Sequence, residues 1–345
     1  MRPTRWPCPA EGPRPERMLG ADDPHPQRLR FVATAFRPPA EAPIADYPLR
    51  LLTGRLRDQW HTMTRTGGVP RLMAQHPEPF LLAHPADAPV PEGALVQAES
   101  GYGRAVFRLK HDEGLPPGTV FAPMHWTARF APAGRVNSTM GGAPDPVSGQ
   151  PELKHVPLRL KPFEAAWHGF LLFRDNLGAD LAPWCAVAPV AGGWRHEMAG
   201  RETPLDAFAR LRALAAGADA EWLLLEDAAA GTHRAALVEG DRLVAALAVA
   251  PSHLLPPRDW LASLLGEALP AGLGAALLAG RPRGGPPPSP TVCVCHSVRE
   301  AAIRAAVAAG ADSVARVGER TRAGTNCGAC RPEIAALLAR ATVPA

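Results

Sequence analysis

Four of the six cysteines fall in two close pairs near the C-terminus, and this spacing constrains the fold more than any other feature of the chain. One residue separates Cys293 from Cys295, and two residues separate Cys327 from Cys330. Four thiolates in this arrangement can ligate an iron–sulfur cluster. A structural zinc site is the alternative, but zinc ribbons usually have two or more residues between the cysteines of each pair. The spacing therefore favours a [2Fe-2S] cluster, and a disulfide pair is the weakest interpretation.

The residues around these pairs predict a small helical domain, residues 291–345. Ser297 followed by Glu300 forms a capping box before an alanine-rich helix, and Gly310 stands where such a helix ends. A last helix is expected over residues 330–341. The partial positive charge at its N-terminus would favour an anionic cluster. The two cysteine pairs are therefore expected to converge at one end of the domain.

These segments resemble a known family. CVCHSV, a helical spacer and GTNCGACRPEI are similar to the bacterioferritin-associated ferredoxin (BFD) domain, a small [2Fe-2S] module found alone or fused to nitrate and nitrite reductases. The likeness covers roughly residues 291–340. It implies that the cluster ligands are Cys293, Cys295, Cys327 and Cys330.

Length and composition limit the remaining possibilities. A chain of 345 residues suits two or three domains, since single cores seldom grow beyond ~250–300 residues. The formal net charge is +4, but acidic residues are interspersed throughout, so we expect no nucleic-acid partner. No stretch approaches the ~20 apolar residues that span a bilayer, and the N-terminus lacks the apolar segment of a signal peptide. We therefore expect no membrane partner and a cytoplasmic location.

The whole sequence predicts a mixed fold of three domains. Residues 1–48 form a proline-rich, extended lead-in, and residues 49–162 form a β-rich domain of short apolar runs. An α+β spacer domain of unknown role follows over residues 163–280. Glycine and proline make residues 281–290 a linker to the small helical domain, residues 291–345.

Several elements are expected inside these domains. Gly101 and Gly103 are placed for a hairpin, and a second hairpin turns between Glu239 and Asp241. Helices are expected over residues 205–216 and 258–268. No G-x-G-x-x-G motif follows a strand, so NAD(P)H binding by this chain is not supported.

The segment TGRLRDQWHTMTRTGG, which begins at Thr53, joins a strand to a loop rich in hydroxyl, guanidinium and backbone donors. Convergent donors of this kind bind phosphates, and arginine can hold them bidentately. On the residues alone, anion binding and an ordinary polar loop are equally good interpretations.

A second resemblance concerns four segments that occur in order between residues 53 and 154: TGRLRDQWHTMTRTG, HPADA, PMHW and VNSTMGGAPDPVSGQPELK. They resemble the C-terminal molybdopterin-dinucleotide-binding domain of assimilatory nitrate reductases, in the molybdopterin oxidoreductase family. The resemblance implies a six-stranded, double-psi-like β-barrel. It also implies part of the site for a molybdenum-bis(molybdopterin guanine dinucleotide) cofactor.

The resemblance also assigns site residues. The first cofactor loop would consist of Thr53, Gly54, Arg55, His61, Thr62, Met63, Thr64 and Arg65. Asp87 is expected to contact the nucleotide, His125 and Trp126 to line the pterin, and Asn137 with Lys154 to close over it. Simpler roles compete, because Trp126 can be core packing, His125 a structural histidine and Asp87 a helix N-cap.

The implied function is that of the C-terminal portion of a molybdenum-dependent nitrate reductase. Such a portion would bind the pterin dinucleotide and relay electrons through the [2Fe-2S] cluster, so that nitrate is reduced to nitrite for assimilation. The electron donor is expected to be a separate reductase or ferredoxin. The rival interpretation is a non-catalytic iron–sulfur electron carrier that partners a separate catalytic chain.

No catalytic residue can be nominated from this sequence. It has no N-terminal [4Fe-4S] motif of the family, and neither Cys8, in the lead-in, nor Cys185, beyond the barrel, suits a molybdenum ligand. Upstream catalytic domains or a separate catalytic subunit would have to complete the enzyme. The chain is then expected to be a fragment of a longer reading frame, a split subunit or a decayed gene product.

Overall fold

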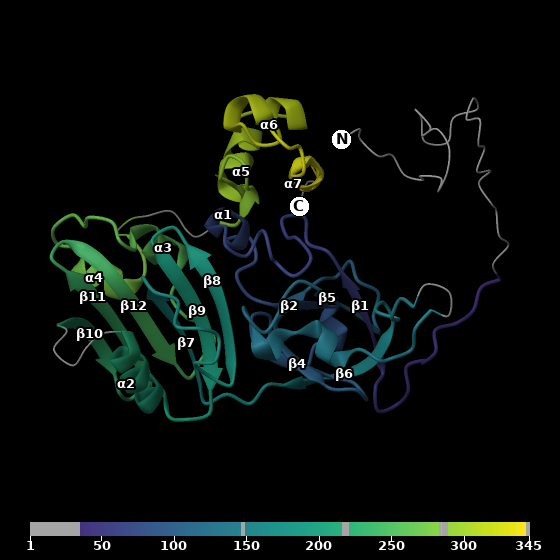
Figure 1. Cartoon of the computed structure of the whole chain (residues 1–345). Helices are drawn as coiled ribbons and strands as arrows, with labels where there is room; N and C mark the ends of the chain where they lie inside the picture. The colour runs from purple at the N-terminus through teal and green to yellow at the C-terminus, as the bar shows by residue number, and fades with distance from the viewer. Residues whose placement is uncertain (1–34, 146–148, 216–220, 283, 285–288, 343–345) are drawn as a thin grey trace, which may run out of the picture. The chain divides into compact units, whose positions relative to one another are not determined.

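Six short strands close into a β-barrel (Figure 1). The computed structural model describes residues 35–145, 149–215, 221–282, 284 and 289–342. Around the barrel the strand order is β1-β5-β2-β4-β3-β6, in which β1 runs parallel to β5 and β2 parallel to β4. The strands are β1 (Leu49–Gly54), β2 (Phe80–Ala83), β3 (Leu95–Glu99), β4 (Arg104–His111), β5 (Thr119–Pro123) and β6 (Val156–Pro162). The predicted six-stranded barrel is confirmed.

The chain divides into two units, Met1–Pro39 and Ala40–Ala345, and every element named here belongs to the second. Residues 1–34 of the predicted lead-in lie outside the described residues. Within the part of the chain that is described, no helix has both the length and the apolar content that crossing a membrane requires.

Side chains alternate along β4 as expected for a strand with two different faces. Ala105, Phe107 and Leu109 fill the barrel, whereas Val106 packs in a second cluster outside it. The predicted hairpin before β4 is confirmed by the antiparallel pairing of β3 with β4. Gly103 is required in its turn, because a Cβ there would lie 2.3 Å from the carbonyl oxygen of Ser138.

The residues after the barrel form a six-stranded antiparallel sheet with helices on both faces (Figure 1). Trp167 and Leu171 pack on one face with α2 (Pro204–Ala215), and Phe170 and Leu172 pack on the other. That other face is covered by α3 (Asp259–Leu264) and α4 (Gly274–Ala279). In spatial order the strands are β10 (Trp222–Asp227), β11 (Thr232–Glu239), β12 (Arg242–Ala250), β7 (Trp167–Phe173), β9 (Gly193–Gly200) and β8 (Trp184–Val190).

Two local predictions in this domain have different outcomes. The hairpin between Glu239 and Asp241 is confirmed, because β11 and β12 pair on either side of it. The helix expected over residues 258–268 is too long, since α3 ends at Leu264. The next residues bridge to the start of β12 instead: the N–H of Gly266 donates to the carbonyl of Leu243 at 2.8 Å.

The last described domain consists of three helices and a two-stranded ribbon packed around Ile303, Val317 and Ile334, all fully buried. The predicted capping box before the first helix is wrong. Ser297 has a φ of 53° and lies in the turn of the ribbon, and its hydroxyl therefore does not cap the helix. Ser289 substitutes for it by accepting the N–H of Ala301 at 2.8 Å.

The bounds of these elements are β13 (Thr291–Cys293), β14 (Val298–Arg299), α5 (Glu300–Ala308), α6 (Val314–Thr321) and α7 (Arg331–Thr342). Gly310 ends α5 as predicted: it has a φ of 90°, and its N–H donates to the carbonyl of Val307 at 2.8 Å.

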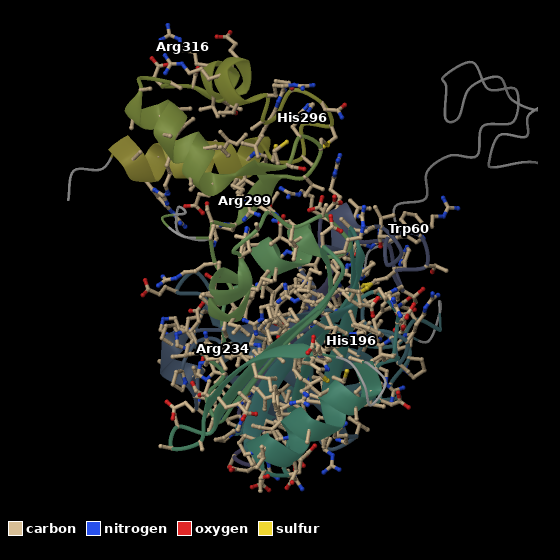
Figure 2. All side chains as sticks on the ribbon, turned by 90° about the vertical axis from the view of Figure 1, so that its left-hand side faces the viewer. Trp60, His196, Arg234, His296, Arg299 and Arg316 are labelled. Atoms are coloured by element: carbon tan, nitrogen blue, oxygen red, sulfur yellow. The ribbon has the colours of Figure 1, made fainter. Side chains whose placement is uncertain are left out.

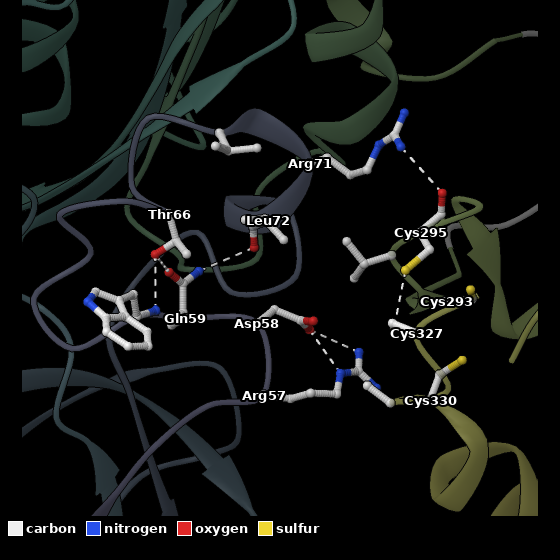
Figure 3. A pocket seen from close by; sticks show the side chains of 14 residues that line it. Arg57, Asp58, Gln59, Thr66, Arg71, Leu72, Cys293, Cys295, Cys327 and Cys330 are labelled. Carbon is white, nitrogen blue, oxygen red and sulfur yellow. Dashed lines mark hydrogen bonds and ion pairs between the residues drawn. The ribbon is translucent and has the colours of Figure 1, made fainter. Parts of the chain in front are cut away.

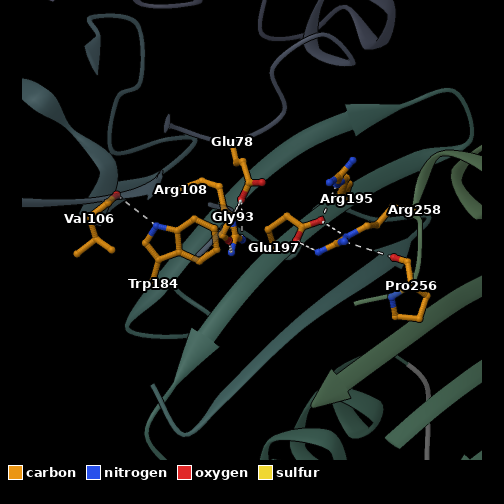
Figure 4. Close-up of polar contacts among 9 residues, drawn as sticks. All are labelled: Glu78, Gly93, Val106, Arg108, Trp184, Arg195, Glu197, Pro256 and Arg258. Carbon is orange, nitrogen blue, oxygen red and sulfur yellow. Dashed lines mark hydrogen bonds and ion pairs between the residues drawn. The ribbon is translucent and has the colours of Figure 1, made fainter. Parts of the chain in front are cut away.

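The edge strand β8 joins the sheet to the barrel. The N–H of Val187 donates to the carbonyl of Phe130 at 2.8 Å, and the indole Nε1 of Trp184 donates to the carbonyl of Val106 at 3.3 Å. Arg108 of the barrel stacks on the ring of Trp184 at 4.9 Å and pairs with Glu78 at 2.9 Å (Figure 4).

A buried carboxylate lies close to this joint (Figure 4). Glu197 is 1% exposed and accepts from Arg195 Nε at 2.7 Å and from Arg258 Nε and Nη2 at 2.9 and 2.8 Å. Burial alone would raise the pKa of Glu197, but the charges of Arg258 and Arg195 lower it to about 2. The network therefore depends on an ionised Glu197.

The substitution Glu197→Gln should destabilise the fold by about 3–5 kcal/mol, because it removes the buried partner charge of Arg258 and leaves Arg195 only Asp259 at 3.7 Å. The folded-state pKa is below the ordinary value of 4.5, so the stabilisation is complete above that pH and is lost as the pH falls towards 2. Urea unfolding of wild type and variant at pH 7 and between pH 5 and 2 measures both effects. The exposed control Glu267→Gln should leave the free energy of unfolding unchanged, and equal losses in the two variants would contradict the assignment.

Candidate functional site

The loop between β1 and α1 (Pro70–Met73), residues 55–69, is fixed by one histidine from a distant segment. His125 follows β5 and is fully buried. Its Nε2 accepts the N–H of Leu56 at 2.8 Å. Its Nδ1 lies 2.9 Å from the carbonyl of Trp60 and 2.8 Å from that of His61, so Nδ1 carries the proton. These three hydrogen bonds support the alternative prediction, in which His125 is a structural histidine.

A buried glutamine closes the same loop on itself. Gln59 Nε2 donates to the carbonyl of Leu72 at 3.2 Å, and its Oε1 accepts from Thr66 Oγ1 at 2.7 Å. Thr66 in turn accepts the N–H of Trp60 at 3.2 Å. The sequence reasoning missed Gln59 and Thr66 as site residues. In the sequence, only their position within the segment TGRLRDQWHTMTRTGG indicated a role in the site.

The middle of the loop is anchored in the core. Met63 is 1% exposed, has a φ of 57° and packs with Phe130 and Trp126. Gly67 donates its N–H to the carbonyl of Met63 at 2.7 Å, and a Cβ at Gly67 would lie 2.4 Å from the ring of Phe130. Met63 is therefore an anchor of the loop. Trp126, at 4% exposure, fills the core as its simpler role requires.

The other predicted loop residues present polar groups at the surface. Arg55 Nη2 lies 3.3 Å from His61 Nε2, and the hydroxyls of Thr62 and Thr64 are 2.6 Å apart. Arg65 is exposed and lies over the ring of Trp60 at 5.7 Å. These residues present hydroxyl, imidazole and guanidinium groups on one loop whose backbone is held by buried side chains. Groups of these kinds bind phosphate.

Strand directions place most of the predicted site residues at one end of the barrel. The loop and His125 share an end, because β1 and β5 are parallel. Lys154 joins them: its Nζ donates to the carbonyl of Thr53 at 2.7 Å, and the Thr53 hydroxyl donates to the carbonyl of Leu153 at 2.7 Å. Gly54 ends β1 beside the ring of Phe121, 2.8 Å from where a Cβ would lie.

Asn137 also lies at this end, and Asp87 does not. Asn137 is exposed on the 3-10 turn Val136–Thr139. Ser138 of this turn donates to the carbonyl of Arg104, the first residue of β4. Because β4 runs antiparallel to β5, its start lies at the end of the barrel where β5 finishes. Asp87 accepts the N–H of Gly118, just before β5, at 2.7 Å. The structure thus does not bring Asp87 to the loop. The N-cap alternative for Asp87 is wrong, because His84 caps that turn.

The four predicted cluster cysteines come together as two pairs. Cys295 Sγ donates to Cys327 Sγ at 3.2 Å, and Cys293 hydrogen-bonds Cys330. All four line one cavity of about 490 Å³. Among the described residues, no three or more His, Cys, Asp or Glu side chains are placed to hold a single metal ion. Four thiols in two neighbouring pairs are the ligand set that a [2Fe-2S] cluster requires.

The local environment differs between these thiols. A hydrogen bond from the backbone of Ala329 lowers the pKa of the exposed Cys327. Burial raises the pKa of Cys330 to about 11. His296, labelled in Figure 2, belongs to the same domain as the four cysteines, and its Nε2 lies 3.3 Å from Thr325 Oγ1.

Cys185 lies apart from the four cysteines, inside the middle sheet, where it is 1% exposed. Burial raises the pKa of its thiol to about 12, so it is not a ligand candidate.

Comparison with known families agrees with both regions. Residues 49–157 match the molydopterin dinucleotide binding domain, and residues 291–340 match the BFD-like [2Fe-2S] binding domain. A nitrate reductase of Klebsiella oxytoca is 35% identical over 329 residues, which cover 90% of this chain and 36% of that protein. The chain is homologous to the C-terminal part of nitrate reductases. The two predicted domain families are confirmed.

Other relatives support the same family with shorter matches. The assimilatory nitrate reductase catalytic subunit of Bacillus subtilis is 35% identical over 164 residues, 46% of this chain and 22% of that protein. A nitrate reductase of Shewanella frigidimarina is 29% identical over 236 residues, 61% of this chain and 25% of that protein. The chain thus spans about a third or less of the length of these relatives.

The cysteine assignment is testable by anaerobic reconstitution of the whole chain with iron and sulfide. Wild type should take up about two irons per chain and show sulfur-to-iron absorption in the visible range. Cys327→Ser should lose most of both, because one iron loses a thiolate ligand. Cys185→Ala serves as the matched control and should keep them. Equal iron content in Cys327→Ser and wild type would refute this ligand set.

Proposed function

We propose that this chain is the pterin-binding and electron-relaying portion of an assimilatory, molybdenum-dependent nitrate reductase. The observation that carries the proposal is the shared cavity. The β1–α1 loop of the molydopterin dinucleotide binding domain lines it on one side, and the four cysteines of the [2Fe-2S] domain line it on the other. One chain therefore brings together the two regions that such an enzyme must connect.

The donors at the loop end of the barrel suit a molybdopterin guanine dinucleotide. Arg55 and Arg65 offer guanidinium groups for phosphate oxygens, and Thr62 and Thr64 offer hydroxyls. His125 and Gln59 act on the ligand only through the loop backbone that they fix. When bound, the molybdenum cofactor would supply the oxygen-atom chemistry that converts nitrate, two electrons and two protons into nitrite and water.

The cysteine end suits entry of the electrons. Cys295 and Cys327 are the more exposed ligands, so an external donor can approach this end of the domain. We propose a separate reductase or ferredoxin in the cytoplasm as that donor. Upstream catalytic domains or a separate catalytic subunit would complete the molybdenum site.

Pterin binding can be tested in chain purified from a host that makes molybdopterin guanine dinucleotide. Arg65→Ala should weaken binding roughly 10- to 100-fold, because a charge-assisted hydrogen bond is worth about 1.5–3 kcal/mol. The measurement is the fluorescence of oxidised pterin released per mole of chain. Arg50→Ala, at the far end of β1 and exposed, is the control and should match wild type.

The same experiment separates the proposal from a non-catalytic iron–sulfur carrier. A carrier whose barrel holds no ligand would release no dinucleotide pterin from wild type or from either variant. Pterin in wild type that Arg65→Ala does not reduce would mean that the loop surface is not the binding surface.

A further inference from the structure

Arg57, in the β1–α1 loop, lines the shared cavity and pairs there with Asp58 (Figure 3). Its Nη1 pairs with Glu333 of α7 at 3.1 Å, and its Nη2 donates to the carbonyl of Val292 at 3.2 Å. Its Nε donates to Asp58 of its own loop at 3.0 Å. Two of the three guanidinium nitrogens therefore join the barrel to the [2Fe-2S] domain, while Asp58 holds the third in place.

A second arginine makes a parallel contact. Arg71 of α1 donates from Nη1 to the carbonyl of Cys295 at 3.3 Å (Figure 3). Val292, the other carbonyl partner, directly precedes Cys293. Both arginines thus hold the backbone of the C-x-C pair, which is the segment that carries two of the four ligands.

The surface that they join is the one that faces the pterin-binding loop. The cavity of about 490 Å³ is lined by all four cysteines and by Gln59, Trp60 and Thr66. The hydrogen bonds of those three residues help to set the loop's conformation, together with those of His125. A cluster bound by these cysteines would face the side of the loop that lines the cavity.

The charges at this contact have a defined electrostatic effect. A cluster bound by four thiolates is an anion, and reduction adds one more negative charge. Nearby positive charge therefore favours the reduced form and raises the reduction potential. Removal of Arg57 would also leave Asp58 and Glu333 without their partner, which adds to the effect in the same direction.

We propose that Arg57 and Arg71 are positioning residues that dock the [2Fe-2S] domain on the β1–α1 loop and raise the reduction potential of its cluster. This inference rests on the proposed function, because it assigns the path by which electrons leave the cluster towards the pterin. It identifies the loop as a shared element, with donors for the dinucleotide on one side and a docking surface for the cluster domain on the other.

The test uses the whole reconstituted chain and follows the reduced-cluster signal by electron paramagnetic resonance during a redox titration. Arg57→Gln should lower the midpoint potential by about 59 mV, which corresponds to a tenfold change in the equilibrium of a one-electron couple. Arg71→Gln should lower it less, because it loses one contact. The double variant should also lose iron faster to a chelator, since the docking contact no longer shields the side of the cluster that faces the loop.

Two further variants make the result specific. The pair Arg57→Glu with Glu333→Arg restores the ion pair in reverse and should recover slow loss of iron, which Arg57→Glu alone should not. Arg316→Gln removes an exposed arginine of α6, labelled in Figure 2 at the outer part of the domain, and should match wild type.

The outcomes separate the two hypotheses. A normal cluster signal whose potential and iron loss are the same in wild type, Arg57→Gln and the double variant would overturn the docking role and leave the proposed function intact. A wild-type chain that assembles no cluster would overturn both.

Discussion

The hydrogen bonds of the two ring nitrogens of His125 determine the conformation of the candidate site. One nitrogen accepts the N–H of Leu56 and the other donates to the carbonyls of Trp60 and His61, so a single buried ring fixes the start and the middle of the β1–α1 loop. A long polar loop is otherwise costly to order. Because the backbone is fixed from inside, the side chains of Arg55, Thr62, Thr64 and Arg65 can remain at the surface.

The rest of the chain is arranged around this loop. The middle sheet contacts the barrel through β8, next to the charge network of Glu197. One of these contacts is made by Phe130, against which the loop packs through Met63. The helical domain contacts the loop through Arg57 and Arg71. The surface proposed to bind the pterin and the domain that carries the four cysteines thereby meet on one short segment. This arrangement gives a physical reason for both domains to occur in one chain.

Much of this could be predicted from sequence, because local patterns carried it. The barrel hairpin follows from its glycines, and the cysteine pairs follow from their spacing. The contacts that fix the site could not be predicted. His125 acts on a residue 69 positions away, and Arg57 on one 276 positions away, which no local pattern encodes. The capping box failed for a related reason, since pairing of β14 with β13 determines the conformation of Ser297. Asp87 fits the motif, but strand direction places it at the other end of the barrel.

The most direct test of the account is to ask whether nitrate removes electrons from the cluster. An antibody against residues 291–345 would capture the protein from nitrate-grown cells in whatever assembly it forms there. The cluster would then be reduced anaerobically and mixed with nitrate. The account predicts that the reduced-cluster signal disappears and that one nitrite forms for every two electrons lost. A signal that nitrate leaves unchanged, in a preparation that contains the dinucleotide pterin, would contradict the central claim.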